Sequence, residues 1–460
     1  MRTSGGRAMR SGSLTAAAMA LTLLGVGATP AHAESVRDMQ WHLDAMGADK
    51  MWKVSQGEGV VVAVLDSGVD DTVADLRGQV LPGKDFSRLS GDENNDIDGH
   101  GTGIAALIAG TGARGPEQGS FGLAPKAKIL PIRIPYNQEQ FQQKGHVDPF
   151  SVNMAKAIRF AADSQAKVIN ISAAQHEQNP DPQLAEAVRY ALSKNKLIFA
   201  GVGNSADTTN DVMYPAATPG VVGVGGLNKK AAWWPKSETG PQVDLAAPAE
   251  DAISACSKGT QLCKGSGTSA ATALASASAA LIWSKHPDWT NNQVLRVMLN
   301  TAGKPKSGKA RTDYLGYGSI RTLRALTTPG DPGAPDVYPL PDLAAAEASA
   351  SPSPSASASS TPAPAEQGKG NDKPATAAPA AESDSGSDTG LWIALGVGAA
   401  LLVGGAAAVV VVRSRRRGAV VQAPPPAMPQ YAPYGAAPQQ PAPYQQNAQY
   451  GPPPGPGQHG

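Results

Sequence analysis

The sequence predicts an α/β fold in which helices cover both faces of a doubly wound, mostly parallel sheet. Between residues 40 and 326, short apolar runs alternate with helical patterns. Val60–Leu65 is apolar at every position, which is typical of a parallel strand buried on both faces. Helical patterns at Val152–Ala162 and Pro182–Ser193 predict crossovers between such strands. Four further runs resemble the first: Ile129–Ile134, Lys167–Ile171, Lys196–Ala200 and Gly220–Val224.

Residues 1–33 have the three-part layout of a secretory signal peptide. Three arginines precede an apolar run, Leu14–Val26, that is too short to span a bilayer comfortably. Ala31-His32-Ala33 then matches the small-residue pattern of a cleavage site. We therefore expect export and a mature chain that begins near Glu34.

The composition changes after the predicted globular domain, residues 34–328. Residues 329–389 are rich in Pro, Ala and Ser, so we expect a disordered, extended linker. Residues 390–412 contain no charged residue and are long enough for one transmembrane helix. Four arginines follow at once, which predicts a cytoplasmic tail, residues 413–460, and a domain outside the cell membrane.

Composition limits the partners that we expect. The chain has 39 Lys and Arg against 38 Asp and Glu, whereas a nucleic-acid-binding domain is strongly basic. The acidic run Asp92–Asp98 offers oxygen ligands of the kind that calcium takes. It lacks the spacing of a known calcium loop, so a solvated acidic loop is the favoured interpretation. We predict no nucleic acid, no metal and no cofactor.

Three segments each place one polar residue where a fold rarely needs it. Asp66 follows the first predicted strand, and catalytic groups gather at the carboxyl ends of parallel strands. His100 and Ser269 each follow glycines at the start of a helix rich in small residues. Taken singly, these residues are typical of a turn, a core histidine and a helix N-cap. Their order along the chain is nevertheless that of the subtilisin Asp-His-Ser triad.

The segments resemble the active-site signatures of the subtilisin-like serine proteases. They read VAVLDSGVD around Asp66, DGHGTGIA around His100 and GTSAA around Ser269. The resemblance covers residues 40–326. It implies that Ser269 attacks the scissile carbonyl, His100 takes its proton and Asp66 orients the imidazole. It also implies that Asn204, in the stretch FAGVGN, and the Ser269 N–H bind the oxyanion.

A strand end provides the expected substrate-binding residues. In this family it usually reads N-x-S-x-G and forms one wall of the pocket for the residue before the scissile bond. Here Ser172, Ala173 and Ala174 occupy it, with Ala174 at the glycine position. The added methyl predicts a preference for small side chains before the cleaved bond. The alternative is that the methyl points away and the pocket is unchanged.

Within this class the chain most resembles the mycosins, actinobacterial proteases associated with type VII secretion. It shares their signal peptide, short N-terminal extension, proline-rich linker, membrane helix and short cytoplasmic end, and the stretch from Gln40 to Trp52 is similar. Only 32 residues separate the predicted cleavage site from Asp66, so we expect no separately folded prodomain. The resemblance implies protein or peptide substrates, a membrane anchor and an association with the type VII secretion machinery.

The segment after Ser269 departs from the family pattern. Ala273, Ala275 and Ala277 stand where proline, valine and glycine are usual. Alanine suits a helix, so an active serine endopeptidase remains the favoured function. The alternative is a catalytically weak or inactive scaffold of a secretion complex. A surface adhesin is disfavoured because it would not need all the polar residues of the site.

Two cysteines, Cys256 and Cys263, lie in one short stretch before Ser269. In an exported chain such a pair is expected to form a local disulfide, the alternative being two free thiols. The bond would close a small loop and steady the approach to the serine.

Overall fold

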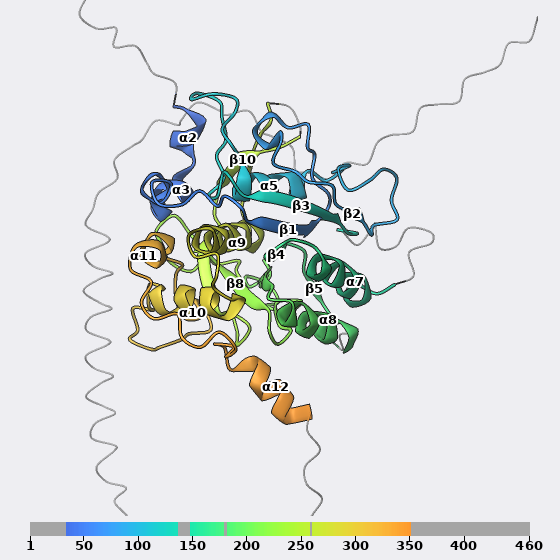
Figure 1. Cartoon of the computed structure of the whole chain (residues 1–460), viewed down its shortest axis with the longest axis vertical. Helices are drawn as coiled ribbons and strands as arrows, with labels where there is room; N and C mark the ends of the chain where they lie inside the picture. Colours follow the sequence, from blue (N-terminus) through green and yellow to red (C-terminus); the bar gives the residue numbers. More distant parts are fainter. Residues whose placement is uncertain (1–33, 137–147, 179–181, 258–259, 351–460) are drawn as a thin grey trace, which may run out of the picture. The chain divides into compact units, whose positions relative to one another are not determined.

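The computed structural model describes residues 34–136, 148–178, 182–257 and 260–350. At its centre lies a seven-stranded sheet in which every pairing is parallel (Figure 1). This architecture confirms the predicted α/β fold with a parallel sheet. In spatial order the strands are β2 Lys84–Asp85, β3 Lys128–Arg133, β1 Val61–Asp66, β4 Val168–Ile171, β6 Leu197–Gly201, β8 Val222–Leu227 and β9 Leu245–Pro248.

The strand order reverses at β1, in the middle of the sheet. β1 pairs with β3 on one side and with β4 on the other. The crossovers on the two sides therefore diverge at the carboxyl end of β1, which is where parallel sheets bind ligands. Asp66 is the last residue of this strand.

Five of the seven strands coincide with the apolar runs of the sequence. The two predicted helices are also present, as α7 Phe150–Asp163 and α8 Pro182–Ser193. β9 was not predicted. Its four residues, Leu-Ala-Ala-Pro, are short, lack β-branched side chains and end on a proline, so local propensity gives no strand signal.

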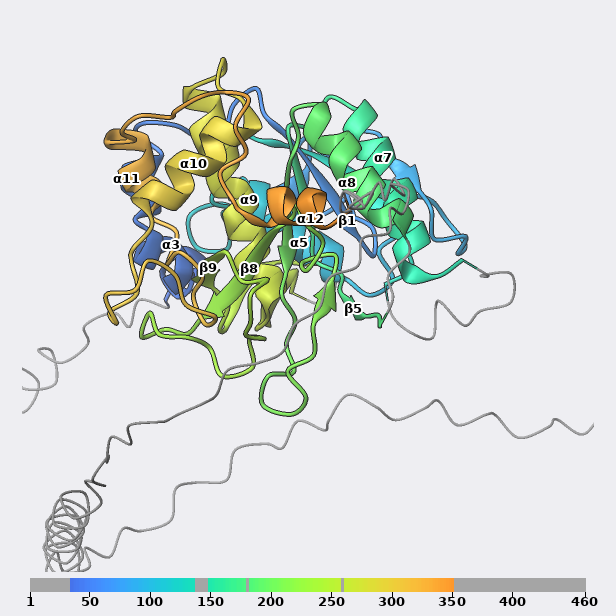
Figure 2. The same cartoon turned by 90° about the horizontal axis from the view of Figure 1, so that it is seen from below.

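Two helices that carry candidate residues pack on one face of the sheet, and α7 and α8 cover the other (Figures 1 and 2). They are α5 His100–Ala109 and α9 Thr268–Lys285. α9 is apolar or small around most of its circumference because it lies under α5, α10 (Asn291–Thr301) and α11 (Thr322–Thr327). Its first turn emerges at the carboxyl edge of the sheet.

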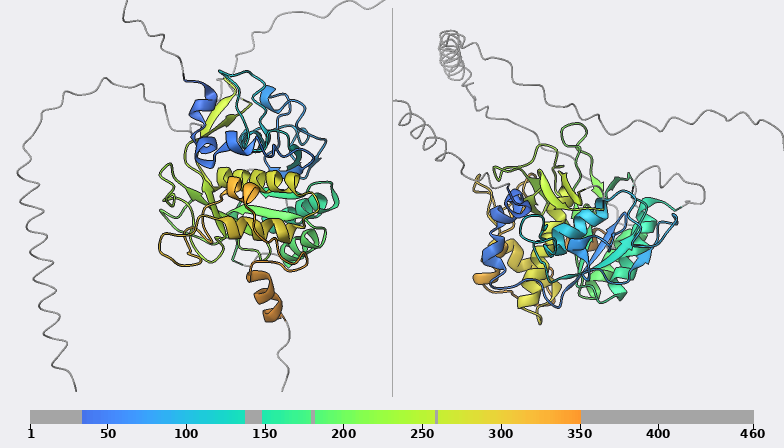
Figure 3. Two further views of the ribbon diagram at one scale, coloured as in Figure 1. Left: turned by 60° about the vertical axis from the view of Figure 1, so that its left-hand side comes forward. Right: turned by 90° about the horizontal axis from the view of Figure 1, so that it is seen from above.

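The N-terminal residues of the described chain pack on the domain. They form α2 Val36–Met39, α3 Trp41–Met46 and α4 Ala48–Met51 (Figure 3). Gln40 is fully buried, and its amide donates to the carbonyls of Phe121 at 2.8 Å and Ile253 at 3.1 Å. The bond to Ile253 ties the N-terminal segment to a β-hairpin, β10 Ala252–Ala255 and β11 Leu262–Gly265.

The chain beyond the predicted domain boundary at residue 328 packs on α10. The Arg296 guanidinium donates to the carbonyls of Pro332 at 2.6 Å and Ala334 at 3.0 Å, and also to that of Val337. Leu340 is buried, and helix α12, Asp342–Ala350, follows. The Pro, Ala and Ser content of this segment predicted a linker from residue 329. Composition could not reveal the packing, because the residues that bind the segment are distant in the sequence.

The other predicted segments lie outside the described residues. These are the signal peptide at 1–33, the linker from 351, the transmembrane helix at 390–412 and the tail at 413–460. In the ranges that are described, none of the helices has the length and apolarity needed to cross a bilayer.

Replacing Arg296 with Ala should release the segment at 331–342 from α10. Because bonds from a charged donor to three carbonyls are lost, we expect the free energy of unfolding to fall by about 1–2 kcal/mol. Urea denaturation measures this change, and limited proteolysis should show new cleavage within 331–342. Arg159→Ala is the control, since Arg159 does not touch the segment: it makes an exposed pair with Glu186 at 3.7 Å and lies over the Tyr190 ring, 5.3 Å from its centroid. Equal proteolysis of the two variants would contradict the proposed anchoring.

Candidate active site

Asp66 and His100 meet at the carboxyl edge of the sheet. Asp66 ends β1 and is fully buried, and His100 is the first residue of α5. His100 Nδ1 lies 2.8 Å from Asp66 Oδ1, and the same oxygen accepts from the Ser67 N–H at 2.8 Å. An ionised carboxylate only accepts hydrogen bonds, so His100 carries its proton on Nδ1 and its Nε2 is a proton acceptor.

A glycine permits this close approach of α5 to β1. A Cβ on Gly101 would lie 2.1 Å from the Gly68 carbonyl oxygen and 3.0 Å from Asp66 Cβ. Any larger residue would push the helix away from the strand and lengthen the Asp66–His100 bond. The glycine after the histidine in DGHGTG is therefore a steric requirement of the site.

The acidic run before His100 holds the start of α5. Asp96 Oδ1 accepts from Ser67 Oγ at 2.7 Å and from the Gly99 N–H at 2.8 Å, while its Oδ2 accepts from the Thr102 N–H at 2.8 Å. Within the described residues, no group of three or more His, Cys, Asp or Glu side chains is arranged to hold a metal ion. Asp96 thus positions the loop that presents His100.

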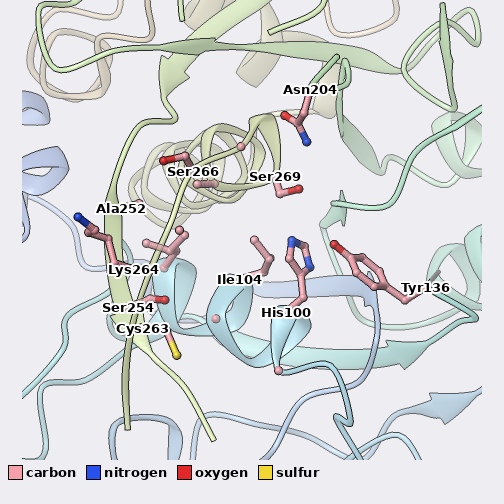
Figure 4. A pocket seen from close by; sticks show the side chains of 16 residues that line it. His100, Ile104, Tyr136, Asn204, Ala252, Ser254, Cys263, Lys264, Ser266 and Ser269 are labelled. Carbon is pink, nitrogen blue, oxygen red and sulfur yellow. The ribbon is translucent and has the colours of Figure 1, made fainter. Parts of the chain in front are cut away.

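Tyr136 is a site residue that the sequence analysis missed. Its ring stacks on that of His100 with centroids 4.6 Å apart (Figure 4). Burial first, and then the nearby carboxylates of Asp66, Asp98 and Asp96, raise the pKa of the Tyr136 phenol, so it stays neutral. No sequence motif marks Tyr136. The only signal in the sequence was its position two residues after a predicted strand, which places it at the carboxyl edge of the sheet.

Ser269 lies in the first turn of α9, beside the His100 ring (Figure 4). Its hydroxyl donates to the Ser172 carbonyl at 3.2 Å, and the Ser172 hydroxyl donates to the Ser269 carbonyl, also at 3.2 Å. Asn170 supports the pair by donating from Nδ2 to Ser172 Oγ at 3.0 Å. Hydrogen bonds between nucleophile and base are often looser before a substrate binds, so this arrangement is compatible with a nucleophilic serine.

Asn204 follows β6 and lies across the cleft from His100. Its Oδ1 accepts from the Thr268 N–H at 2.8 Å and from Thr268 Oγ1 at 3.1 Å. Because the oxygen is held by Thr268, the amide NH₂ is the end left for a group in the cleft. The Asn204 amide and the first turn of α9 together provide N–H donors beside Ser269.

The three predicted substrate-binding residues line one cavity of about 240 Å³ next to Ser269. Ser172 and Ala173 are buried, and Ala174 is exposed at the edge. Gly203 and Met213 also line this cavity. Ala174 thus borders the space in which its methyl was predicted to restrict substrates.

Comparisons with known proteins agree with this geometry. The model of the subtilase family matches residues 57–318, a range that contains all the residues described above as the site. The chain belongs to the subtilase family. It is a serine-type endopeptidase by this membership, related to the mycosins.

Two curated relatives and two solved structures illustrate the similarity. Mycosin-1 of Mycobacterium tuberculosis is 31% identical over 347 residues, covering 65% of this chain and 76% of that protein. The major intracellular serine protease of Bacillus subtilis is 30% identical over 226 residues, covering 48% and 67%. The crystal structure of MycP1 from Mycobacterium smegmatis has a TM-score of 0.57 at 28% identity, covering 65% and 86%. MycP3 protease from the type VII (ESX-3) secretion system has a TM-score of 0.54 at 31% identity, covering 63% and 88%.

The departures from the subtilase pattern leave α9 intact. Ala273, Ala275 and Ala277 are fully buried within a continuous helix. Ser276, between two of these alanines, donates to Asn170 Oδ1 at 3.0 Å. The alanines therefore let α9 pack closely on the sheet while Ser276 connects it to the residues around Ser269.

The structure joins Cys256 and Cys263 in a disulfide. The bond connects the end of β10 to β11, whose last residue, Gly265, lies four residues before Ser269. A cross-link over so short a loop restricts the unfolded chain and holds the hairpin that leads to the serine.

The electrostatic surroundings of His100 favour its charged form. Burial acts most strongly and lowers the pKa of the imidazole, but Asp66, Asp96 and Asp98 together outweigh it. The pKa of His100 therefore lies above its usual 6.5. An imidazole that must be neutral to accept a proton is then available only at higher pH.

We expect kcat/KM to rise with pH through an apparent pKa above 6.5, because only neutral His100 can act as a base. Asp98→Asn removes one of the carboxylates and should move this acid limb to lower pH. The movement should shrink at high salt, since Asp98 is exposed. Asp71→Asn is the control, as Asp71 is not among the groups that act on His100. An acid limb that stays in place in Asp98→Asn would exclude this electrostatic account.

Proposed function

We propose that this subtilase hydrolyses peptide bonds with Ser269 as nucleophile, His100 as general base and acid, and Asp66 as the partner that orients the imidazole. The observation that supports this most is the 2.8 Å contact between the buried Asp66 and His100 Nδ1, with His100 lining the same cavity as Ser269. A buried, ionised Asp66 stabilises the imidazolium that forms when His100 takes a proton. This function requires no metal or cofactor.

The chemistry proceeds in two halves. Ser269 Oγ forms a bond to the scissile carbonyl carbon while its proton passes to His100 Nε2. His100 then returns that proton to the leaving nitrogen, which breaks the peptide bond and leaves an acyl-serine. A water molecule that gives its proton to His100 hydrolyses the ester and restores Ser269.

The oxyanion that forms in each half lies between two donors. One is the Asn204 amide, whose orientation is set by Thr268. The other is the Ser269 N–H in the first turn of α9, where backbone N–H groups lack helical partners and the helix dipole is positive. In subtilisin, a relative of this protein, removing one preorganised donor of this kind costs about 2.7–4 kcal/mol of transition-state stabilisation.

Replacing Ser269 with Ala should abolish labelling by a fluorophosphonate probe and lower peptide hydrolysis by orders of magnitude. Wild-type protein should be labelled. Ser278→Ala should still be labelled, because it removes a buried hydroxyl of the same helix that bonds to the Leu274 carbonyl and Thr322 and not to the residues around Ser269. Circular dichroism shows whether each variant is folded. Folded wild-type protein that the probe does not label would exclude the protease mechanism.

The second candidate is a catalytically weak or inactive scaffold of a secretion complex. One observation favours it: the Ser269 hydroxyl donates to the Ser172 carbonyl rather than to His100. The alanines after Ser269 in place of the usual family residues point the same way. The probe experiment separates the two candidates, because a scaffold that keeps this hydrogen bond would remain unlabelled.

We further propose that the protein is exported, held in the cell membrane by the helix at 390–412, and associated with a type VII secretion system. The signal-like residues 1–33 and the four arginines after 412 support a domain outside the membrane and a tail at 413–460 in the cytoplasm. Similarity to MycP3 from a type VII secretion system, and to a periplasmic assembly of an ESX-5 inner membrane complex, supports the association. Its substrates are proteins or peptides outside the membrane.

External protease added to intact cells should release the folded domain by cutting in the chain between residues 351 and 389. The released fragment should keep its fluorophosphonate label, and an epitope at residue 460 should stay with the cells. Cells opened by lysis serve as the control, since there both sides are accessible. A domain that is cut only after lysis would contradict the proposed orientation.

A further inference from the structure

A second cavity lies on the other side of Ser269 from Ser172, Ala173 and Ala174. Its volume is about 280 Å³. One wall is α5 and the other is the β10–β11 hairpin, and its mouth is bordered by His100, Asn204 and Ser269 (Figure 4). The proposed mechanism uses the mouth of this cavity but gives no role to its interior.

Small side chains create the interior. Gly103 on α5, Ala252 and Ser254 on β10, and Ala270 on α9 all line it. A Cβ on Gly103 would lie 3.3 Å from Ser254 Oγ, so the two walls come together at this pair. A larger residue at any of the four positions would occupy space that is now open.

Apolar side chains contribute the larger share of the cavity surface. Ile104 and Leu107 from α5 line it, as does Cys263, whose sulfur is bonded to Cys256. Lys264 also borders it, but its ammonium lies 3.6 Å from Asp251, outside the cleft. With Lys264 paired to Asp251, the described residues of the interior hold no unpaired charge to receive a charged group, and Ile104 and Leu107 offer contacts to an apolar one.

The catalytic geometry decides which part of a substrate reaches this cavity. His100 gives its proton to the leaving nitrogen, so the leaving half of the substrate must lie beside His100. The cavity at Ala173 and Ala174 borders Ser269 but not His100, which suits the acyl half. The second cavity borders both Ser269 and His100, which suits the residue directly after the scissile bond.

We propose that the cavity between α5 and the β10–β11 hairpin selects a large apolar side chain, such as Leu, Met or Phe, directly after the scissile bond. This inference rests on the proposed function. Gly103, Ala252, Ser254 and Ala270 are specificity-determining residues in this account, because their small size makes the room. Ile104 and Leu107 supply the apolar contacts.

The test uses purified full-length protein and internally quenched peptides that carry Ala before the bond and Leu, Phe, Gly or Asp after it. The cleaved bond is identified by mass spectrometry. We expect kcat/KM for Leu and Phe to exceed that for Gly by about tenfold or more, the range in which apolar pockets discriminate. Equal values for the four peptides, or a preference for Gly or Asp, would overturn the proposal.

Ser254→Leu should fill the cavity and lower the Phe-to-Gly ratio of kcat/KM by about tenfold. Ile253→Leu is the matched control, because Ile253 is adjacent on β10, does not line the cavity and alternates to the other face of the strand. Its ratio should equal that of the wild type. An unchanged ratio in Ser254→Leu would overturn the proposal.

Gly103→Ala adds a methyl to the same cavity from α5, and it gives an independent result if Ser254→Leu does not fold. Alanine is the better helix former, and its methyl should lower the Phe-to-Gly ratio by less than Ser254→Leu does. A ratio that does not fall would again contradict the proposal. Failure of the proposed function has a different signature: no peptide is cleaved and Ser269 is not labelled, and the specificity proposal falls with it.

Discussion

The burial of the Asp66 carboxylate is the constraint on which the rest of the site depends. Asp66 is fully buried, and its Oδ2 has no hydrogen-bond partner among the described residues. An unpaired charge in that position would be costly, so the bond from His100 to Oδ1 stabilises the fold as well as the site. That bond in turn requires Gly101, since any side chain there would hold α5 away from β1.

The second constraint is the packing of α9, which connects the core to Ser269. The helix is buried along almost its whole length, so Ser269 cannot move without disturbing the centre of the domain. Hydrogen bonds from Ser276 to Asn170, from Asn170 to Ser172 and from Ser172 to the Ser269 carbonyl link β4 to the first turn of α9. Small residues in α9 allow this close contact with the sheet, which explains how the family's usual residues can be absent while the site keeps its shape.

Three interactions hold the β10–β11 hairpin, although it is a two-stranded element outside the main sheet. Gln40 bonds to the Ile253 carbonyl from the N-terminal segment. The disulfide between Cys256 and Cys263 joins the two strands. Arg114 Nη1 donates to the Thr260 carbonyl in the turn at 2.8 Å. A wall held in this way can keep a cavity open beside Ser269 without collapsing into it.

The sequence by itself predicted the parallel sheet and named the polar residues of the candidate site. Buried strands such as β1 are apolar at every position, and Asp66, His100, Asn204 and Ser269 stand in short motifs next to predicted strand ends or helix starts. Only the tertiary structure decided how Tyr136 covers His100, how Thr268 orients Asn204, and that the chain after residue 328 packs on Arg296. Each of these depends on contacts between residues far apart in the sequence, which leave no local periodicity. The two cavities beside Ser269 also appear only in the tertiary structure, because their volume depends on the sizes of side chains from several elements at once.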